Sequence, residues 1–118
     1  MNRASAQRLA DIDAAIGRIR EYVGDLAQAD ISSPLVADAV VHNLLVIGEA
    51  VKGLDESTRL AAPDVPWADI AGMRDILVHH YFRVDPAIVE RTVRKELLPL
   101  EEAVRGLLGV AGDPPAPG

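Results

Sequence analysis

Apolar residues recur along four stretches of the chain at spacings of three and four, which is the period of an amphipathic α-helix. The first stretch runs from Ser5 to about Gln28. Its apolar positions are Leu9, Ile12, Ile16, Ile19, Val23 and Leu26. The second stretch, residues 35–54, is apolar on more than one face. A helix of this kind is covered on two sides, either centrally in a bundle or at a subunit interface.

Prolines mark where the later helices begin. Pro34, Pro66 and Pro86 each suit the first position of a helix, and Ser33 and Asp85 are suitable N-caps for two of them. The segment 58–65 is predicted to be a loop. The third helix then runs from Pro66 to a residue between 78 and 81, and the fourth runs from residue 86 to 108.

These elements predict an all-α antiparallel bundle of four main helices. A length of 118 residues allows one domain, and a composition of 49% hydrophobic but only 3% aromatic residues favours helix packing through Leu, Ile, Val and Ala. Pro99 lies inside the fourth helix and predicts a kink or a short break. We assign residues 1–108 to the helical domain and expect residues 109–118, which lack periodicity, to be a disordered tail.

Composition limits the classes of function. The absence of Cys excludes disulfides and thiolate chemistry, which fits the cytoplasm, and no apolar run approaches the roughly 18 residues that would indicate a membrane span. A net charge of -6 argues against a broad nucleic-acid-binding surface. However, the segment 74–95 holds five basic and three acidic residues, a local charge of +2, so a small phosphate-handling site is compatible with the sequence.

Candidate chemistry is concentrated in residues 74–85. Arg74 is a permanent cation that suits phosphate, His79 can transfer a proton near neutral pH, and Tyr81 offers a phenolic hydroxyl. Asp75 lies four residues before His79, so on a regular helix the two side chains can touch, and Asp75 would then fix the histidine tautomer. We assign supporting roles to Asp75 and to the adjacent His80.

The spacing of Arg74 and His79 raises a geometric problem. Five residues on a helix correspond to a rotation of about 140°, so the two side chains cannot converge on one substrate atom from a regular helix. Either the helix ends near Val78 and His79 swings back, or a second copy of the chain completes the site across a two-fold axis. The two options are compatible with each other.

One reaction fits these residues economically. RNA carries its own nucleophile, the 2′-hydroxyl, so its cleavage needs a base, an acid and a cation for the developing phosphorane charge. His79 would serve as base or acid and Arg74 as the cation, with a histidine of a second subunit in the other proton-transfer role. The reaction needs no cofactor, and the sequence predicts no metal site.

Structural roles are the alternative for every one of these residues, because Arg, His and Tyr are common near helix ends. His42, a lone histidine on an apolar helix, is predicted to be structural, and Trp67 to be a core or capping residue. Glu49 and Lys52 are interpreted as a solvated or interfacial pair.

The motif formed by Arg74, His79 and Tyr81 resembles the hallmark of the HepT-like toxins of the HEPN family, which is Arg, four residues, His, one residue and Tyr. Asp75 stands where the family often has Asn or Asp. Arg83 stands where many members have a small residue, and we assign it at most a weak contact with an RNA phosphate.

The flanking sequence extends the resemblance to roughly residues 8–108. The segment Ile47-Gly48-Glu49-Ala50-Val51-Lys52 is similar to the family's second-helix segment. Residues 63–75 resemble the approach to the motif, and residues 81–85 resemble its exit.

The resemblance implies an all-α homodimer whose two motifs meet in a cleft, and a metal-independent endoribonuclease that is the toxin of a toxin–antitoxin pair. It also implies a partner, a minimal nucleotidyltransferase (MNT-type) antitoxin that transfers AMP to Tyr81. A phosphate ester at Tyr81 would add charge and bulk beside Arg74 and exclude RNA. The alternative is a non-catalytic helical dimer that binds such a nucleotidyltransferase as an interaction module.

Overall fold

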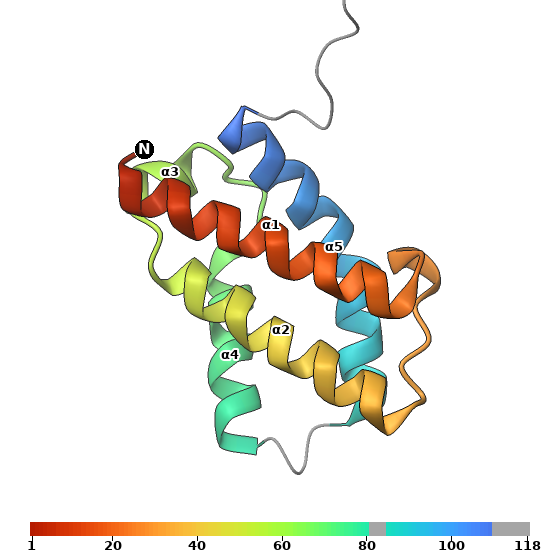
Figure 1. The fold of residues 1–118 in the computed structure, drawn as a ribbon. Coiled ribbons are helices and arrows are strands. Elements are labelled where there is room, and N and C mark those ends of the chain that lie inside the picture. The colour runs from red at the N-terminus through yellow and green to blue at the C-terminus, as the bar shows by residue number, and fades with distance from the viewer. Residues whose placement is uncertain (81–84, 110–118) are drawn as a thin grey trace, which may run out of the picture.

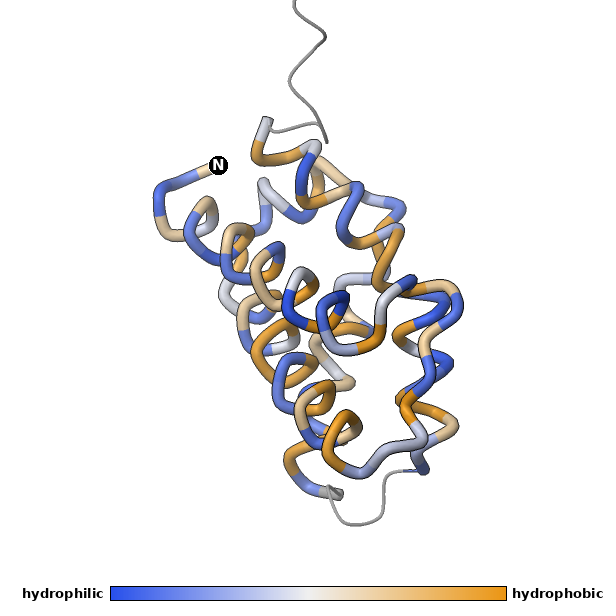
Figure 2. The backbone as a smooth tube through the Cα atoms, turned by 45° about the vertical axis from the view of Figure 1, so that its right-hand side comes forward, coloured by the Kyte–Doolittle hydropathy of each residue, from blue (hydrophilic) through white to orange (hydrophobic). Residues whose placement is uncertain are grey.

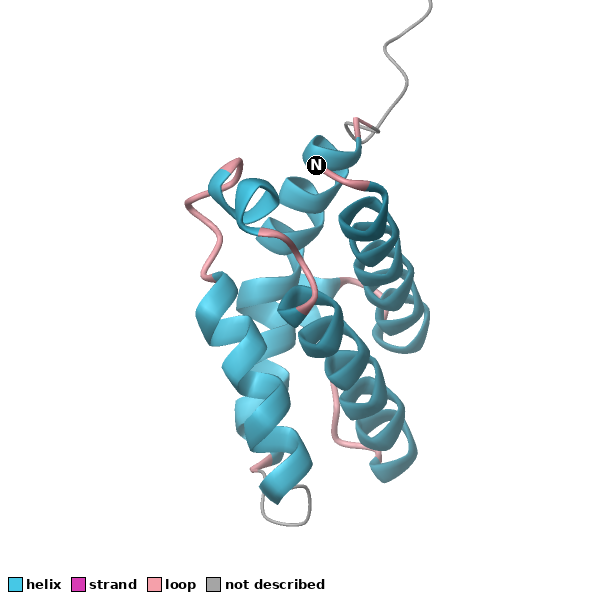
Figure 3. Cartoon of the chain, turned by 90° about the vertical axis from the view of Figure 1, so that its left-hand side faces the viewer, coloured by secondary structure: helices cyan, strands magenta, loops and turns pink. Residues whose placement is uncertain are grey.

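The computed structural model describes residues 1–80 and 85–109 as a bundle of four main helices, with no strand in these ranges (Figures 1 and 3). The elements in chain order are α1 (Arg3–Val23), the 3-10 turn η1 (Leu26–Gln28), α2 (Pro34–Lys52), the short α3 (Glu56–Leu60), α4 (Trp67–His80) and α5 (Pro86–Leu108). The predicted all-α fold of four main helices is therefore confirmed.

Helix α2 occupies the centre of this arrangement. It packs against α1 on one side and α4 on another, while α5 packs against α1 (Figure 1). The two-sided apolar pattern predicted this position correctly. By length and composition α2 is also the one helix of the described residues that is apolar enough to cross a membrane, but almost half of its apolar window is buried among its neighbours. Packing in the bundle is sufficient to explain its apolar character.

The core follows from the helical stripes. Apolar and polar residues alternate along the turns of each helix (Figure 2). The largest completely buried side chains are Leu9, Ile12, Ile16, Ile19, Leu44, Ile47, Leu97 and the valines at positions 40, 51, 93 and 104. Trp67 joins them at 7% exposure, and its Nε1 donates to the carbonyl oxygens of Arg59 and Ala62 at 3.1 and 3.0 Å. Trp67 is thus a core residue that closes the turn before α4, as predicted.

The starts of the second and fourth predicted helices agree with the sequence, whereas the third begins at Trp67, one residue after the predicted Pro66. Asp85 accepts a hydrogen bond from the Ala87 amide at 2.9 Å, and Ser33 accepts one from the Val36 amide at 3.4 Å. Both residues are therefore N-caps, each followed by proline at the first helical position.

Two expectations about the course of the chain need correction, and the kink or short break expected at Pro99 loses only its second alternative. The first helix does not reach Gln28, because Gly24 has a φ of 76° and ends α1 before the turn η1 begins. The predicted loop 58–65 contains the end of α3, which Asp55 caps through the Thr58 amide at 2.8 Å. Helix α5 continues through Pro99, so the short break is not observed. The predicted tail lies outside the described residues from position 110 onward and stays a prediction.

Candidate active site

Helix α4 carries the residues that sequence reasoning selected. Arg74, Asp75 and His79 all lie within the regular helix, and His80 is its last residue. Because α4 continues past Val78, the option in which the helix ends there and His79 swings back is wrong. Tyr81 and Arg83 lie outside the described residues, so their predicted roles stay predictions.

Arg74 is held by carboxylates from two helices. Its Nε lies 2.8 Å from Oε2 of Glu49 on α2, and its NH1 lies 3.1 Å from Oδ1 of Asp75. Asp75 in turn accepts a hydrogen bond from Nζ of Lys52 at 3.1 Å. The four charges therefore alternate in sign between α2 and α4. In the described part of the chain Asp75 contacts Lys52 and Arg74, and the contact with His79 that its spacing allowed is not formed.

The two helices lie in close contact behind Arg74. A Cβ atom added at Gly48 would overlap the Cβ of Arg74 and lie 3.2 Å from its Cα. Position 48 must therefore lack a side chain for α4 to lie where it does. This close approach places Glu49, the next residue on α2, within reach of the guanidinium.

Arg74 also lines an open hollow of about 430 Å³ on the surface. The hollow is lined by Arg8 and Asp11 of α1, by His42, Leu45, Val46, Glu49 and Ala50 of α2, and by Arg74 and Val78 of α4. Two of its charged residues are basic and two are acidic, so their charges balance one another. His42 was predicted to be structural, but it is exposed and shares this hollow with Arg74. His79 is exposed on α4, one residue beyond Val78.

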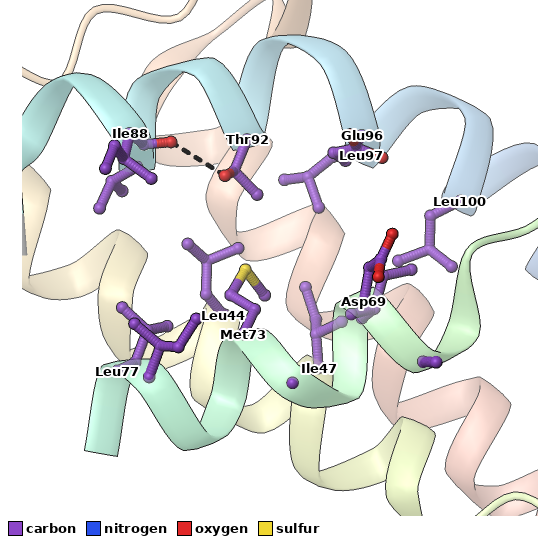
Figure 4. A pocket seen from close by; sticks show the side chains of 15 residues that line it. Leu44, Ile47, Asp69, Met73, Leu77, Ile88, Thr92, Glu96, Leu97 and Leu100 are labelled. Atoms are coloured by element: carbon purple, nitrogen blue, oxygen red, sulfur yellow. Dashed lines mark hydrogen bonds between the residues drawn. The ribbon is translucent and has the colours of Figure 1, made fainter. Parts of the chain in front are cut away.

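A second cavity, of about 440 Å³, lies between α4 and α5 on a different face of α4. Met73 and Leu77 of α4 face Ile88 and Thr92 of α5 across it, and Thr92 donates a hydrogen bond to the Ile88 carbonyl at 2.9 Å (Figure 4). Its lining contains no Arg, Lys or His. Arg74 and His79 therefore lie outside this cavity. The described residues hold no cluster of three or more His, Cys, Asp or Glu that would suit a metal ion.

The ionisation of Asp75 is coupled to this network. The hydrogen bond from Lys52, followed by that from Arg74, lowers the pKa of the Asp75 carboxyl below its ordinary value. A lowered pKa in the folded state stabilises the fold at pH values above the ordinary pKa, and this contribution is lost as the pH falls through the folded-state pKa.

We therefore expect Asp75→Asn to melt at a lower temperature than the wild type at pH 7, and the difference to shrink as the pH falls from about 5 to about 2. Thermal unfolding followed by circular dichroism across this range measures the effect, which is small because Asp75 is half exposed. Asp64→Asn, on the exposed loop before α4, is the control for loss of a surface charge. A melting difference that stayed constant down to pH 2 would contradict the coupling.

The structure defines an all-helical bundle in which α4 carries Arg74 and the exposed His79 five residues apart. Comparison with known proteins identifies the family to which this helical protein belongs. The profile of the family described as Ribonuclease HepT-like matches residues 12–107. The chain belongs to the HepT-like ribonuclease family, as the resemblance predicted.

Individual relatives agree with this assignment. A candidate RNase of Caldanaerobacter subterraneus subsp. tengcongensis is 44% identical over 78 residues, which cover 66% of this chain and 70% of the relative. The probable ribonuclease HepT of Thermococcus cleftensis is 34% identical, over 82% of this chain and 89% of its own length. A candidate RNase of Methanocaldococcus jannaschii is 38% identical, over 74% of this chain and 78% of its own length. No solved structure matches the chain.

Sequence reasoning selected Arg74 and His79, whose roles stay predictions, and it misassigned the contacts of two neighbouring residues. Glu49 and Lys52 are not a pair with each other, because each binds a partner on α4. One available signal was the sequence Gly48-Glu49 in the middle of an apolar helix, since glycine within a helix costs about 1 kcal/mol and often marks a close approach of another helix.

Proposed function

We propose that this protein is a metal-independent endoribonuclease and the toxin of a toxin–antitoxin pair. Family membership supplies the ribonuclease class. The observation that carries the finer proposal is the position of Arg74, which is fixed at the wall of an open hollow on the same helix as the exposed His79.

In the proposed reaction the 2′-hydroxyl of RNA attacks the adjacent phosphorus. A base removes the hydroxyl proton as the new P–O bond forms, and an acid protonates the departing 5′-oxygen as the old P–O bond breaks. The products are a 2′,3′-cyclic phosphate and a 5′-hydroxyl end. Arg74 stabilises the charge that develops on the non-bridging oxygens, and His79 transfers one of the two protons.

The proposal includes a homodimer. Arg74 and His79 are five residues apart on a continuous helix, which corresponds to about 140° around its axis, so one copy presents them in different directions. A second copy related by a two-fold axis would bring another His79 to the first copy's Arg74. It would also supply the second proton-transfer group that the reaction requires.

The proposed regulator is an MNT-type nucleotidyltransferase antitoxin that transfers AMP to Tyr81 in the cytoplasm. Tyr81 follows α4 directly, two residues after His79. An adenylyl group there would place a phosphate and an adenosine close to the catalytic residues, where they would compete with RNA by charge and by volume.

The test is RNA cleavage by purified protein in excess EDTA, with mass spectrometry to establish that Tyr81 is unmodified. We expect the wild type to produce 2′,3′-cyclic phosphate ends and His79→Ala to cleave about 10²–10⁴-fold more slowly. Cleavage that requires a metal ion would refute the proposed mechanism. A folded, unmodified dimer that cleaves no RNA but binds a nucleotidyltransferase would favour the interaction module instead.

A further inference from the structure

We infer that Glu49 is a positioning residue, which holds the Arg74 guanidinium through an ion pair at Nε and leaves the NH2 donors for one RNA phosphate. This inference rests on the proposed ribonuclease function. The contact that carries it is the 2.8 Å ion pair between Arg74 Nε and Glu49 Oε2, which joins α4 to α2.

The hydrogen-bonding capacity of arginine shows what this contact leaves free. A guanidinium has five N–H donors in a rigid plane. Asp75 accepts a hydrogen bond from NH1, and Glu49 forms an ion pair with Nε, so neither contact occupies the two N–H donors of NH2. One N–H of NH2 lies on the same edge as Nε and the other lies at the end of the group, and each can donate a hydrogen bond to a phosphate oxygen.

The stem of Arg74 is fixed independently of Glu49. The Cβ and Cα of Arg74 pack against the backbone at Gly48, and the side chain is 30% exposed. Ordering a free surface arginine normally costs much of what an exposed ion pair contributes. Here packing has already ordered the first part of the side chain, so Glu49 needs to fix only the orientation of the guanidinium plane. An ion pair to a carboxylate that is itself 58% exposed is sufficient for that role.

Charge balance explains why orientation matters at this site. Glu49 and Asp75 offset Arg74 and Lys52, so this cluster has a net charge of zero when all four side chains are ionised. RNA therefore gains little from a general positive field here and depends on directed hydrogen bonds from Arg74. If the guanidinium were rotated away from this orientation, it would lose those hydrogen bonds in the transition state, where the phosphorane charge is greatest.

Two substitutions separate positioning from charge. Glu49→Gln keeps a side-chain oxygen that can face Nε but removes the negative charge, whereas Glu49→Ala removes both. We expect Glu49→Ala to lower kcat at least tenfold and Glu49→Gln to stay within about threefold of the wild type, since transition-state contacts appear in kcat. KM for RNA should fall slightly or stay constant in both variants, because each loses a negative charge. Glu102→Gln, at an exposed position on α5, is the matched control.

A second measurement is independent of cleavage. In the free wild-type protein the Arg74 Nε–Hε resonance should exchange slowly with solvent, and this protection should persist in Glu49→Gln and disappear in Glu49→Ala. Equal kcat values for the Ala and Gln variants, or no protection in the wild type, would overturn the positioning role. If no RNA is cleaved by any variant but the resonance behaves as expected, the ribonuclease proposal fails while the orientation of Arg74 by Glu49 stands.

Discussion

Replacing Arg74 with alanine should lower the rate of RNA cleavage by about 10²–10³-fold, the usual effect of removing one donor that stabilises transition-state charge. The side chain brings its guanidinium to the wall of the hollow with the NH2 donors not engaged by Glu49 or Asp75, and no other arginine on α4 can replace it. The loss should appear mainly in kcat, because the charge on the phosphorane oxygens exists only during the reaction. Initial rates on a single-stranded RNA in EDTA, measured over a range of RNA concentrations, provide both constants.

Two further variants make this result interpretable. Arg3→Ala removes an arginine from the exposed start of α1 and should leave the rate unchanged. Arg74→Lys keeps the charge but has no planar fork, so it should recover only part of the lost activity. Full recovery by lysine would show that position 74 acts as a point charge, and full activity of Arg74→Ala with unchanged melting would place the site elsewhere. Circular dichroism must show that each variant remains helical.

Much of the fold was predictable because its signals are local. The N-caps at Ser33 and Asp85 and the two-sided apolar pattern of α2 each depend on residues within a few positions of one another. The predicted end of α1 was wrong because the apolar stripe includes Val23 and Leu26 on both sides of Gly24. Periodicity alone cannot show that the glycine adopts a positive φ and ends the helix between them.

The site was predictable in part, for a related reason. Arg74 and His79 stand out because proton-transfer groups and a cation lie close together in the sequence. The role of Glu49 depends on its contact with Arg74, a residue 25 positions away, and this contact is set by how α2 crosses α4. The charges within α2 alone suggest a pair between Glu49 and Lys52, which the structure does not form. Nearby helical charges do interact at such spacings, which made the wrong pairing reasonable.

The glycine behind Arg74 gives the second large prediction. Gly48→Ala should lower the free energy of unfolding, because the added methyl group would overlap the Cβ of Arg74 and press on its Cα. These atoms belong to a helix backbone and its first side-chain carbon, so they cannot rotate away, and overpacking of this kind costs about 1–3 kcal/mol. The gain in helix propensity, about 1 kcal/mol, offsets only part of that cost. Since α4 must shift to make room, we also expect RNA cleavage to fall at temperatures where the variant is still folded.

Gly17→Ala is the control, since Gly17 also lies within a long helix but has nothing within 4 Å of an added Cβ. This substitution should raise the free energy of unfolding by about 0.5–1 kcal/mol through helix propensity alone. Urea unfolding of both variants therefore tests the sign as well as the size of the effect. If Gly48→Ala were as stabilising as Gly17→Ala, the close approach of α2 and α4 would be wrong. If it were destabilising but fully active, the position of Arg74 would tolerate a shift of its helix, and the fixed geometry inferred for the guanidinium would lose its structural basis.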